Sequence, residues 1–132
     1  MKYTLGKQER LKSRKLIEKL YTEGKSVKSF PLRMVYLQTE HTSDFPCQVG
    51  VSVPKRNFKL AVDRNRIKRL MRESYRLQKE IVYDHLEEPY VFMISYIGGE
   101  EVKYEAIYSK MEKLLTLFID KTKTQKDEKI QP

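Results

Sequence analysis

The feature that most constrains the fold is the largely apolar run YVFMISYI at residues 90–97, which polar segments flank on both sides. The run has the length of a strand and is too short for a typical helix. Its lack of polar alternation is typical of a strand that is buried on both faces. A chain with such a strand needs a sheet that is covered by other elements.

Several other segments have the patterns of strands and helices. The segment CQVGVSV alternates, with Cys47, Val49, Val51 and Val53 on one face, and Pro54 ends it. The other expected elements are a strand at residues 32–37, an additional strand at 27–30, and helices at 13–24, about 63–85 and about 103–121.

This order, α-β-β-(β)-α-β-α, suits an antiparallel hairpin joined to a β-α-β unit, which makes a two-layer α+β sandwich. The chain has 132 residues, a length that suits one domain with one modest core. We expect that domain over residues 1–120 and a disordered polar tail over residues 121–132.

Several classes of protein are not expected from this sequence. No stretch approaches the roughly 20 apolar residues that cross a bilayer, and the first residues contain no secretory signal. Cys47 is the only cysteine, so no internal disulfide can form and the cytoplasm is the expected location. His41 and His85 are far apart and give no zinc-binding pattern. The acidic pairs at 87–88 and 100–101 fall in expected loops, so no metal site is expected in the protein.

Positive charge is concentrated in two parts of the chain. The formal net charge is +9, to which residues 1–20 contribute +5 and residues 55–76 contribute +7, whereas residues 77–120 carry −5. Such a distribution indicates a polyanionic partner that approaches from one side. Nucleic acid fits better than a membrane, because the apolar face of the basic segment lacks the Trp and Phe anchors of an interfacial helix.

The segment DRNRIKRLMRESYR, residues 63–76, carries most of this charge. Projected on a helix, it separates into an apolar face and a cationic face, with Arg66 at the edge of the apolar face. Asp63 has the position of an N-cap. Like charges one turn apart repel, so their clustering indicates a partner that neutralises them. The preference for Arg over Lys favours bidentate contacts to phosphate.

DNA is not the expected partner of this helix. A helix-turn-helix would need another helix immediately upstream, and the upstream segment is a strand, Pro54 and the loop KRNFKLAV.

The sequence RNRIKRLMRESYR, preceded by VGVSVPKR, resembles the signature of the bacterial ribonuclease P protein component. The segment LKSRKLIEKLYTEGKSV resembles the first helix and following strand of that family, and the closing helix from Val102 also fits. Only the last dozen residues fall outside the resemblance. It implies a two-layer α+β fold that is shared with a ribosomal protein domain, in which the basic helix is a left-handed crossover between parallel strands.

The resemblance also implies a function and two RNA partners. The protein would be a subunit of ribonuclease P, which removes the 5′ leader from precursor tRNA. In that family the RNA carries out the chemistry with Mg²⁺, so neither a catalytic residue nor a metal or cofactor site is expected in the protein. The residues implied to bind the catalytic RNA are Arg64, Asn65, Arg66, Lys68, Arg69, Arg72 and Arg76.

A second site is implied in a cleft between the first helix and the sheet, where the leader would bind. The residues implied to line this cleft are Ile17, Tyr21, Tyr36, Ser52, Lys55 and Arg56. The main alternative is a ribosomal or ribosome-assembly protein that binds structured RNA and belongs to no enzyme, since a basic helix suits either function.

Overall fold

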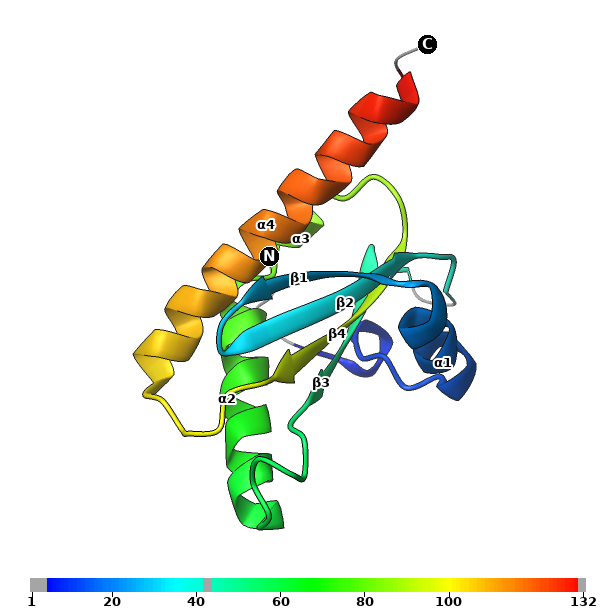
Figure 1. The fold of residues 1–132 in the computed structure, drawn as a ribbon. Coiled ribbons are helices and arrows are strands. Elements are labelled where there is room, and N and C mark those ends of the chain that lie inside the picture. The colour runs from blue at the N-terminus through cyan, green and yellow to red at the C-terminus, as the bar shows by residue number, and fades with distance from the viewer. Residues whose placement is uncertain (1–4, 42–43, 131–132) are drawn as a thin grey trace.

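The computed structural model describes residues 5–41 and 44–130, with side chains described as far as residue 123. Its sheet has four strands in the order β1-β2-β4-β3, with helices on both faces (Figure 1). The elements are η1 (Lys7–Glu9), α1 (Arg14–Glu23), β1 (Lys25–Ser29), β2 (Leu32–Gln38), β3 (Cys47–Ser52), α2 (Ala61–Gln78), α3 (Glu80–Tyr83), β4 (Tyr90–Tyr96) and α4 (Tyr104–Ile130).

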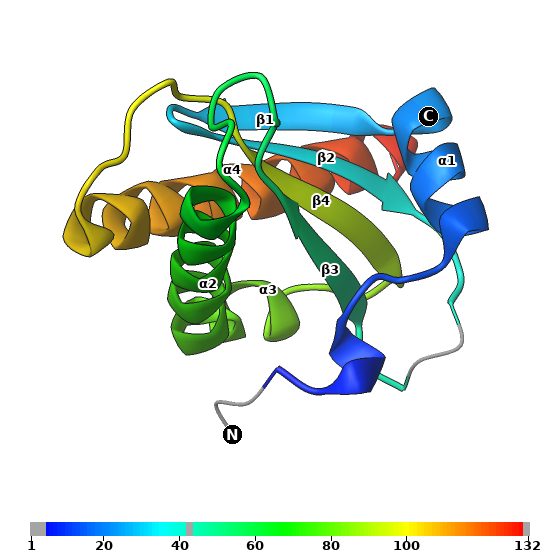
Figure 2. The same ribbon diagram turned by 90° about the horizontal axis from the view of Figure 1, so that it is seen from below.

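The apolar run forms the interior strand β4, which pairs antiparallel with β2 and parallel with β3. The prediction that it is buried on both faces is confirmed. Phe92 and Ile94 belong to the core under α2 and α4, whereas Val91 and Met93 belong to the smaller core under α1. The connection from β3 through α2 to β4 is left-handed, as the family resemblance implies (Figure 2). This is an exception to the right-handed default.

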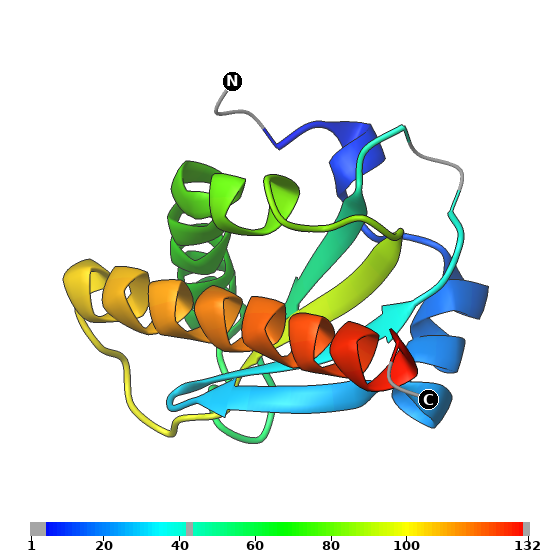
Figure 3. The same ribbon diagram turned by 90° about the horizontal axis from the view of Figure 1, so that it is seen from above.

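The main core lies between the sheet and the pair of helices α2 and α4, which cross the same face (Figure 3). Its aromatic rings meet edge to face or at a tilt: Phe92 is 5.8 Å from Tyr75 and 5.5 Å from Phe118, measured between ring centroids. All three side chains are almost completely buried. Burial of each large apolar side chain contributes about 1.5–3 kcal/mol to folding, so this layer fixes α2 firmly against the sheet.

Two expectations about the hairpin and the first helix are confirmed. The additional strand exists as β1, which begins at Lys25, directly after α1, and pairs antiparallel with β2. Ser13 caps α1, since its Oγ accepts a hydrogen bond from the backbone N–H of Leu16 at 3.3 Å.

The boundaries of α2 differ from those expected. The helix begins at Ala61 rather than after Asp63, and its N-cap residue, Leu60, makes no side-chain capping bond. Asp63 therefore lies in the first turn, where its carboxylate pairs with Arg66 at 2.9 Å instead of capping the helix. The helix ends at Gln78, and the short helix α3 follows in place of a continuous helix to residue 85.

The last helix is longer than expected. It continues to Ile130 and so includes most of the segment for which a disordered tail was expected, while residues 131–132 lie outside the described part of the chain. None of the helices within residues 5–41 and 44–130 has both the length and the apolar composition that a membrane crossing requires.

Candidate nucleic-acid interface

The loop before α2 is held in place by two sets of hydrogen bonds. Asn57 donates from Nδ2 to the backbone carbonyl of Gly98 at 3.3 Å, which ties the loop to the turn after β4. Arg64 donates to the carbonyls of Phe58 and Lys59 at 2.7 and 2.8 Å. Arg64, which was expected to meet RNA, therefore also fixes the loop from which α2 begins.

Arg66 and Arg76 are neutralised within the protein. The guanidinium of Arg66 donates to both carboxylate oxygens of Glu101, at 2.9 and 2.7 Å, and to Asp63 at 2.9 Å. The hydrogen bonds and charge of Glu101 raise the pKa of Arg66, and Arg66 in turn lowers the pKa of Glu101. Arg76 pairs in the same way with Glu73. These pairs compete with any contact that the two arginines make to RNA.

Three cations of α2 have no such partner. Within the described residues, Lys68, Arg69 and Arg72 make no hydrogen bond or ion pair, and together we call them the α2 ridge. Arg69 and Arg72 are exposed and Lys68 is half-buried. Arg69 and the exposed Asn65 also line a shallow hollow beside the start of α2. Cations one turn apart destabilise an isolated helix, so the ridge is suited to a polyanion.

On the other face of the sheet, α1 covers only one end (Figure 2). Its Leu20 is completely buried against the smaller core, which includes Val35 and Met93. Beyond this covered end, the strand register aligns four side chains from four different strands in one row. The row consists of Lys28, Arg33, Ser95 and Ser52.

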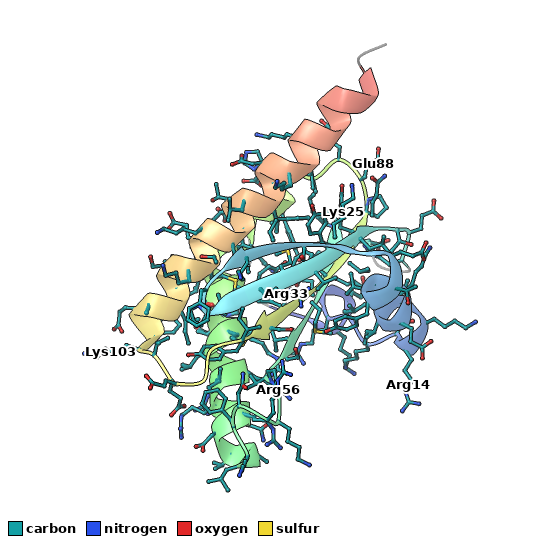
Figure 4. The ribbon with its side chains drawn as sticks, viewed as in Figure 1. Arg14, Lys25, Arg33, Arg56, Glu88 and Lys103 are labelled. Carbon is teal, nitrogen blue, oxygen red and sulfur yellow. The ribbon has the colours of Figure 1, made fainter. Side chains whose placement is uncertain are left out.

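This row gives the open face both positive charge and hydroxyl groups. Lys28 and Arg33 are exposed, and the hydroxyls of Ser52 and Ser95 lie 2.7 Å apart. Figure 4 labels Arg33 on β2 and Arg56 in the loop after β3. Of this row, only Ser52 was expected from the sequence. Two features of the sequence could have indicated the other residues of the row. Arg33 is a cation within an expected strand, and Ser95 is the single small polar residue of the apolar run.

Tyr36 does not line this face, and the expectation that it does is corrected. The side chain is 4% exposed and lies in the main core on the opposite face, with its ring 4.9 Å from Phe118 and 6.3 Å from Tyr90. Alternate residues of a strand point to opposite faces. Since Val35 packs under α1, Tyr36 must point toward α4.

The other expected cleft residues border the open face. Tyr21 of α1 is 54% exposed and offers an accessible ring, while the neighbouring Ile17 is half-buried and packs on the smaller core. Lys55 and Arg56 are exposed in the loop that follows β3, next to Ser52. An accessible aromatic ring on the helix that covers the same side of the sheet as these cations and hydroxyls is suited to single-stranded nucleic acid.

A buried ionic cluster joins the N-terminal segment to the end of α2. Lys79 Nζ lies 2.7 Å from Glu9 Oε2, and each side chain is 2% exposed. The hydroxyl of Tyr83 donates to the same carboxylate oxygen, and the backbone N–H of Gly6 donates to Oε1 at 3.2 Å. Burial opposes the ionisation of Glu9, but the bonds from Lys79, Tyr83 and Gly6 outweigh it and lower the pKa of this carboxyl.

Cys47 is completely buried, close to the hydroxyl of Tyr75. Burial raises the pKa of its thiol to about 12, so the thiolate is scarce at neutral pH and the residue serves as core. Within the described part of the chain, His, Cys, Asp and Glu side chains form no group of three that could hold a metal ion.

Comparisons with known proteins point to one family. The family model described as Ribonuclease P matches residues 5–118. The ribonuclease P protein component of Porphyromonas gingivalis is 44% identical over 91 residues, which are 68% of this chain and 66% of that protein. The aligned segment thus spans slightly less than two thirds of that relative. The component from Chlorobium phaeobacteroides is 34% identical over 125 residues, covering 85% of this chain and 86% of that protein.

The solved structure of the Staphylococcus aureus RNase P protein has the same fold. It superposes with a TM-score of 0.67 at 22% identity, covering 83% of this chain and 94% of that one. Because the family model spans most of the chain, including α1, the open sheet face and the whole of α2, the chain belongs to the ribonuclease P protein component family.

Proposed function

We propose that this protein is the protein subunit of ribonuclease P, and that it acts on precursor tRNA only together with the catalytic RNA of that enzyme. One observation carries this proposal. The protein has two separate cationic surfaces, the α2 ridge and the open sheet face, and they differ in chemistry.

The α2 ridge is a set of cations on a rigid helix, without aromatic groups among them, and suits the phosphates of a folded RNA. We assign it to the catalytic RNA. The open face combines Tyr21 with the cations and hydroxyls of Arg33, Ser52 and Ser95. That combination suits an extended single strand, and we assign it to the 5′ leader of precursor tRNA.

In this proposal the catalytic RNA holds Mg²⁺ and carries out the hydrolysis, and the protein contributes binding. Neutralisation of phosphates by the protein lowers the repulsion between two RNA molecules. The concentration of Mg²⁺ that the reaction needs should therefore fall when the protein is bound. The cytoplasm, where transcripts are processed, is the location that we propose.

Reconstitution tests this function. The purified protein should stimulate a bacterial ribonuclease P RNA in cleaving precursor tRNA at low Mg²⁺, where the RNA alone is slow, and should cleave nothing by itself. The measurement is the rate of single-turnover cleavage across a Mg²⁺ titration. An unchanged Mg²⁺ requirement would favour the alternative, a protein that binds structured RNA outside any enzyme.

Replacement of Tyr21 tests the leader site. Stacking of one base on an aromatic ring contributes about 1–3 kcal/mol, so Tyr21→Ala should weaken binding of leader-containing precursor to the holoenzyme by roughly fivefold or more. Binding of mature tRNA should stay the same. Tyr21→Phe keeps the ring and should behave as the unchanged protein. Equal losses for precursor and mature tRNA would remove Tyr21 from the leader site.

A further inference from the structure

A third cationic site lies between the N-terminal segment and α2, and it shares Arg72 with the α2 ridge. It is a hollow of about 220 Å³ at the outer edge of β3. Its cations are Arg10 and Lys12 from the segment between η1 and α1, and Arg72 from α2. Its floor is apolar, with Leu11, Val49 and Val51 among the lining residues.

We propose that this hollow binds one phosphodiester of RNA, with the attached nucleoside against the apolar floor. The inference rests on the proposed function and adds a binding site to it. Two separate segments of the sequence, residues 10–12 and the middle of α2, supply the three charges, and no acidic side chain of the described residues lines the hollow. Three cations that line one hollow, with no anion among its described lining residues, repel one another unless a ligand neutralises them.

The cations retain donors for a ligand. Arg10 uses only its Nε within the described residues, in a bond to the carbonyl of Leu5 at 3.1 Å, and a guanidinium has five N–H donors. Lys12 is exposed, and like Arg72 it makes no hydrogen bond or ion pair with any described residue. A planar guanidinium beside an ammonium group is suited to the oxygens of a phosphate.

The edge of β3 adds backbone groups to the same site. The N–H of Leu11 donates to the carbonyl of Val49 at 2.9 Å, so the N-terminal segment continues the sheet at this point. Alternate residues of a strand direct their backbone groups to the same edge. The backbone groups of Val51 therefore face the hollow beside this bond.

The N-terminal segment is anchored rather than loose, so the hollow is formed before RNA binds. Glu9 is held by the buried pair with Lys79, and the side-chain amide of Gln48 donates to the carbonyl of Gln8 at 3.1 Å. These contacts precede Arg10 in the sequence and the bond from Leu11 to Val49 follows it, so its backbone is fixed on both sides. Preorganisation of this kind lowers the entropy that binding must overcome.

The hollow also opens toward a larger cationic groove. Arg10 and Lys12 line both, and the groove adds Lys7 and Lys15 along with Glu40 and His41. An RNA strand whose phosphate sits between Arg72 and Arg10 can therefore continue along the start of α1. This arrangement connects the α2 side of the protein with the α1 side.

The phosphodiester could belong to the catalytic RNA or to the precursor, and two measurements separate these sources. The first is the affinity of the protein for the catalytic RNA alone. The second is the affinity of the assembled holoenzyme for precursor and for mature tRNA. Arg10→Ala and Lys12→Ala should each weaken one of these affinities by about fivefold and reduce its salt slope by about one unit.

Lys113→Ala is the matched control, because Lys113 is an exposed lysine of α4 that lines neither hollow. Arg10 and Lys12 are also exposed, so the variants should keep the thermal unfolding midpoint of the unchanged protein. If they affect the affinities no more than Lys113→Ala does, the inference is wrong while the proposed function stands. If the unchanged protein fails to stimulate the RNA, both are wrong.

A double-mutant cycle tests whether the charges share one phosphate. The fold loss in RNA affinity for Arg10→Ala combined with Arg72→Ala should be at least threefold smaller than the product of the two single losses. The reason is that either change alone already removes the contact to the shared phosphate. For Arg10→Ala combined with Lys68→Ala, the fold loss in RNA affinity should equal the product of the two single losses. Multiplication in both pairs would mean separate phosphates and would overturn the shared site.

Discussion

Glu9→Ala is expected to lower the free energy of unfolding by about 3–5 kcal/mol, the usual cost of removing one partner of a buried ion pair. Lys79 would keep its charge at 2% exposure without the carboxylate that lies 2.7 Å away in the intact protein. The loss is a large part of the 5–15 kcal/mol by which a small domain is stable. Urea unfolding followed by circular dichroism measures it.

Replacement of both partners separates the charge effect from the packing effect. Glu9→Met combined with Lys79→Met removes the unpaired charge and keeps most of the buried volume, so it should recover most of the lost stability. The comparison variant is Glu18→Ala, at an exposed position of α1, which should change stability by less than about 0.5 kcal/mol. A double variant as unstable as Glu9→Ala would contradict the account of the ion pair.

The same pair makes stability depend on pH. The folded-state pKa of Glu9 is lower than its ordinary value. Its contribution is therefore complete above the pKa of the unfolded chain and is lost as pH falls through the folded-state pKa. The stability difference between the unchanged protein and Glu9→Gln should shrink as the solution is acidified. A difference that stays constant on acidification would contradict the ionised state of Glu9.

The sequence predicts the elements of this fold well because their patterns are local. The alternation that begins at Cys47 and the apolar run at 90–97 each determine a strand without reference to the rest of the chain. The start of α2 was misplaced because Asp63 has two physical uses near a helix N-terminus. It can cap the helix, or it can pair with a cation one turn further along. In this protein Asp63 pairs with Arg66.

The parts of the site that were missed depend on contacts between distant segments. LRMVYL carries large groups on both faces, so the sequence leaves open which face Tyr36 joins, and only the pairing of β2 with β4 decides it. The row from Lys28 to Ser52 exists only when four strands are in register. Glu9 and Lys79 are 70 residues apart, and nothing local marks either as buried.

The strongest test of the proposed interface is the combined change of Lys68, Arg69 and Arg72 to alanine. A charge-assisted hydrogen bond contributes about 1.5–3 kcal/mol, so loss of three phosphate contacts should weaken binding to the catalytic RNA by roughly a thousandfold. The slope of log affinity against log salt should decrease in magnitude by about three units, one for each contact. Filter binding across a salt series measures both quantities.

Arg66→Ala is the informative comparison within the same helix. Glu101 and Asp63 already neutralise Arg66, so this arginine should neutralise no RNA phosphate. Its removal should therefore leave the salt slope close to that of the unchanged protein. The contrast distinguishes the α2 ridge from net positive charge in general, because a nonspecific effect would give every arginine of α2 the same slope change. A slope that falls as much for Arg66→Ala as for Arg69→Ala would show that the ion pair with Glu101 opens when RNA binds, and Arg66 would then join the ridge.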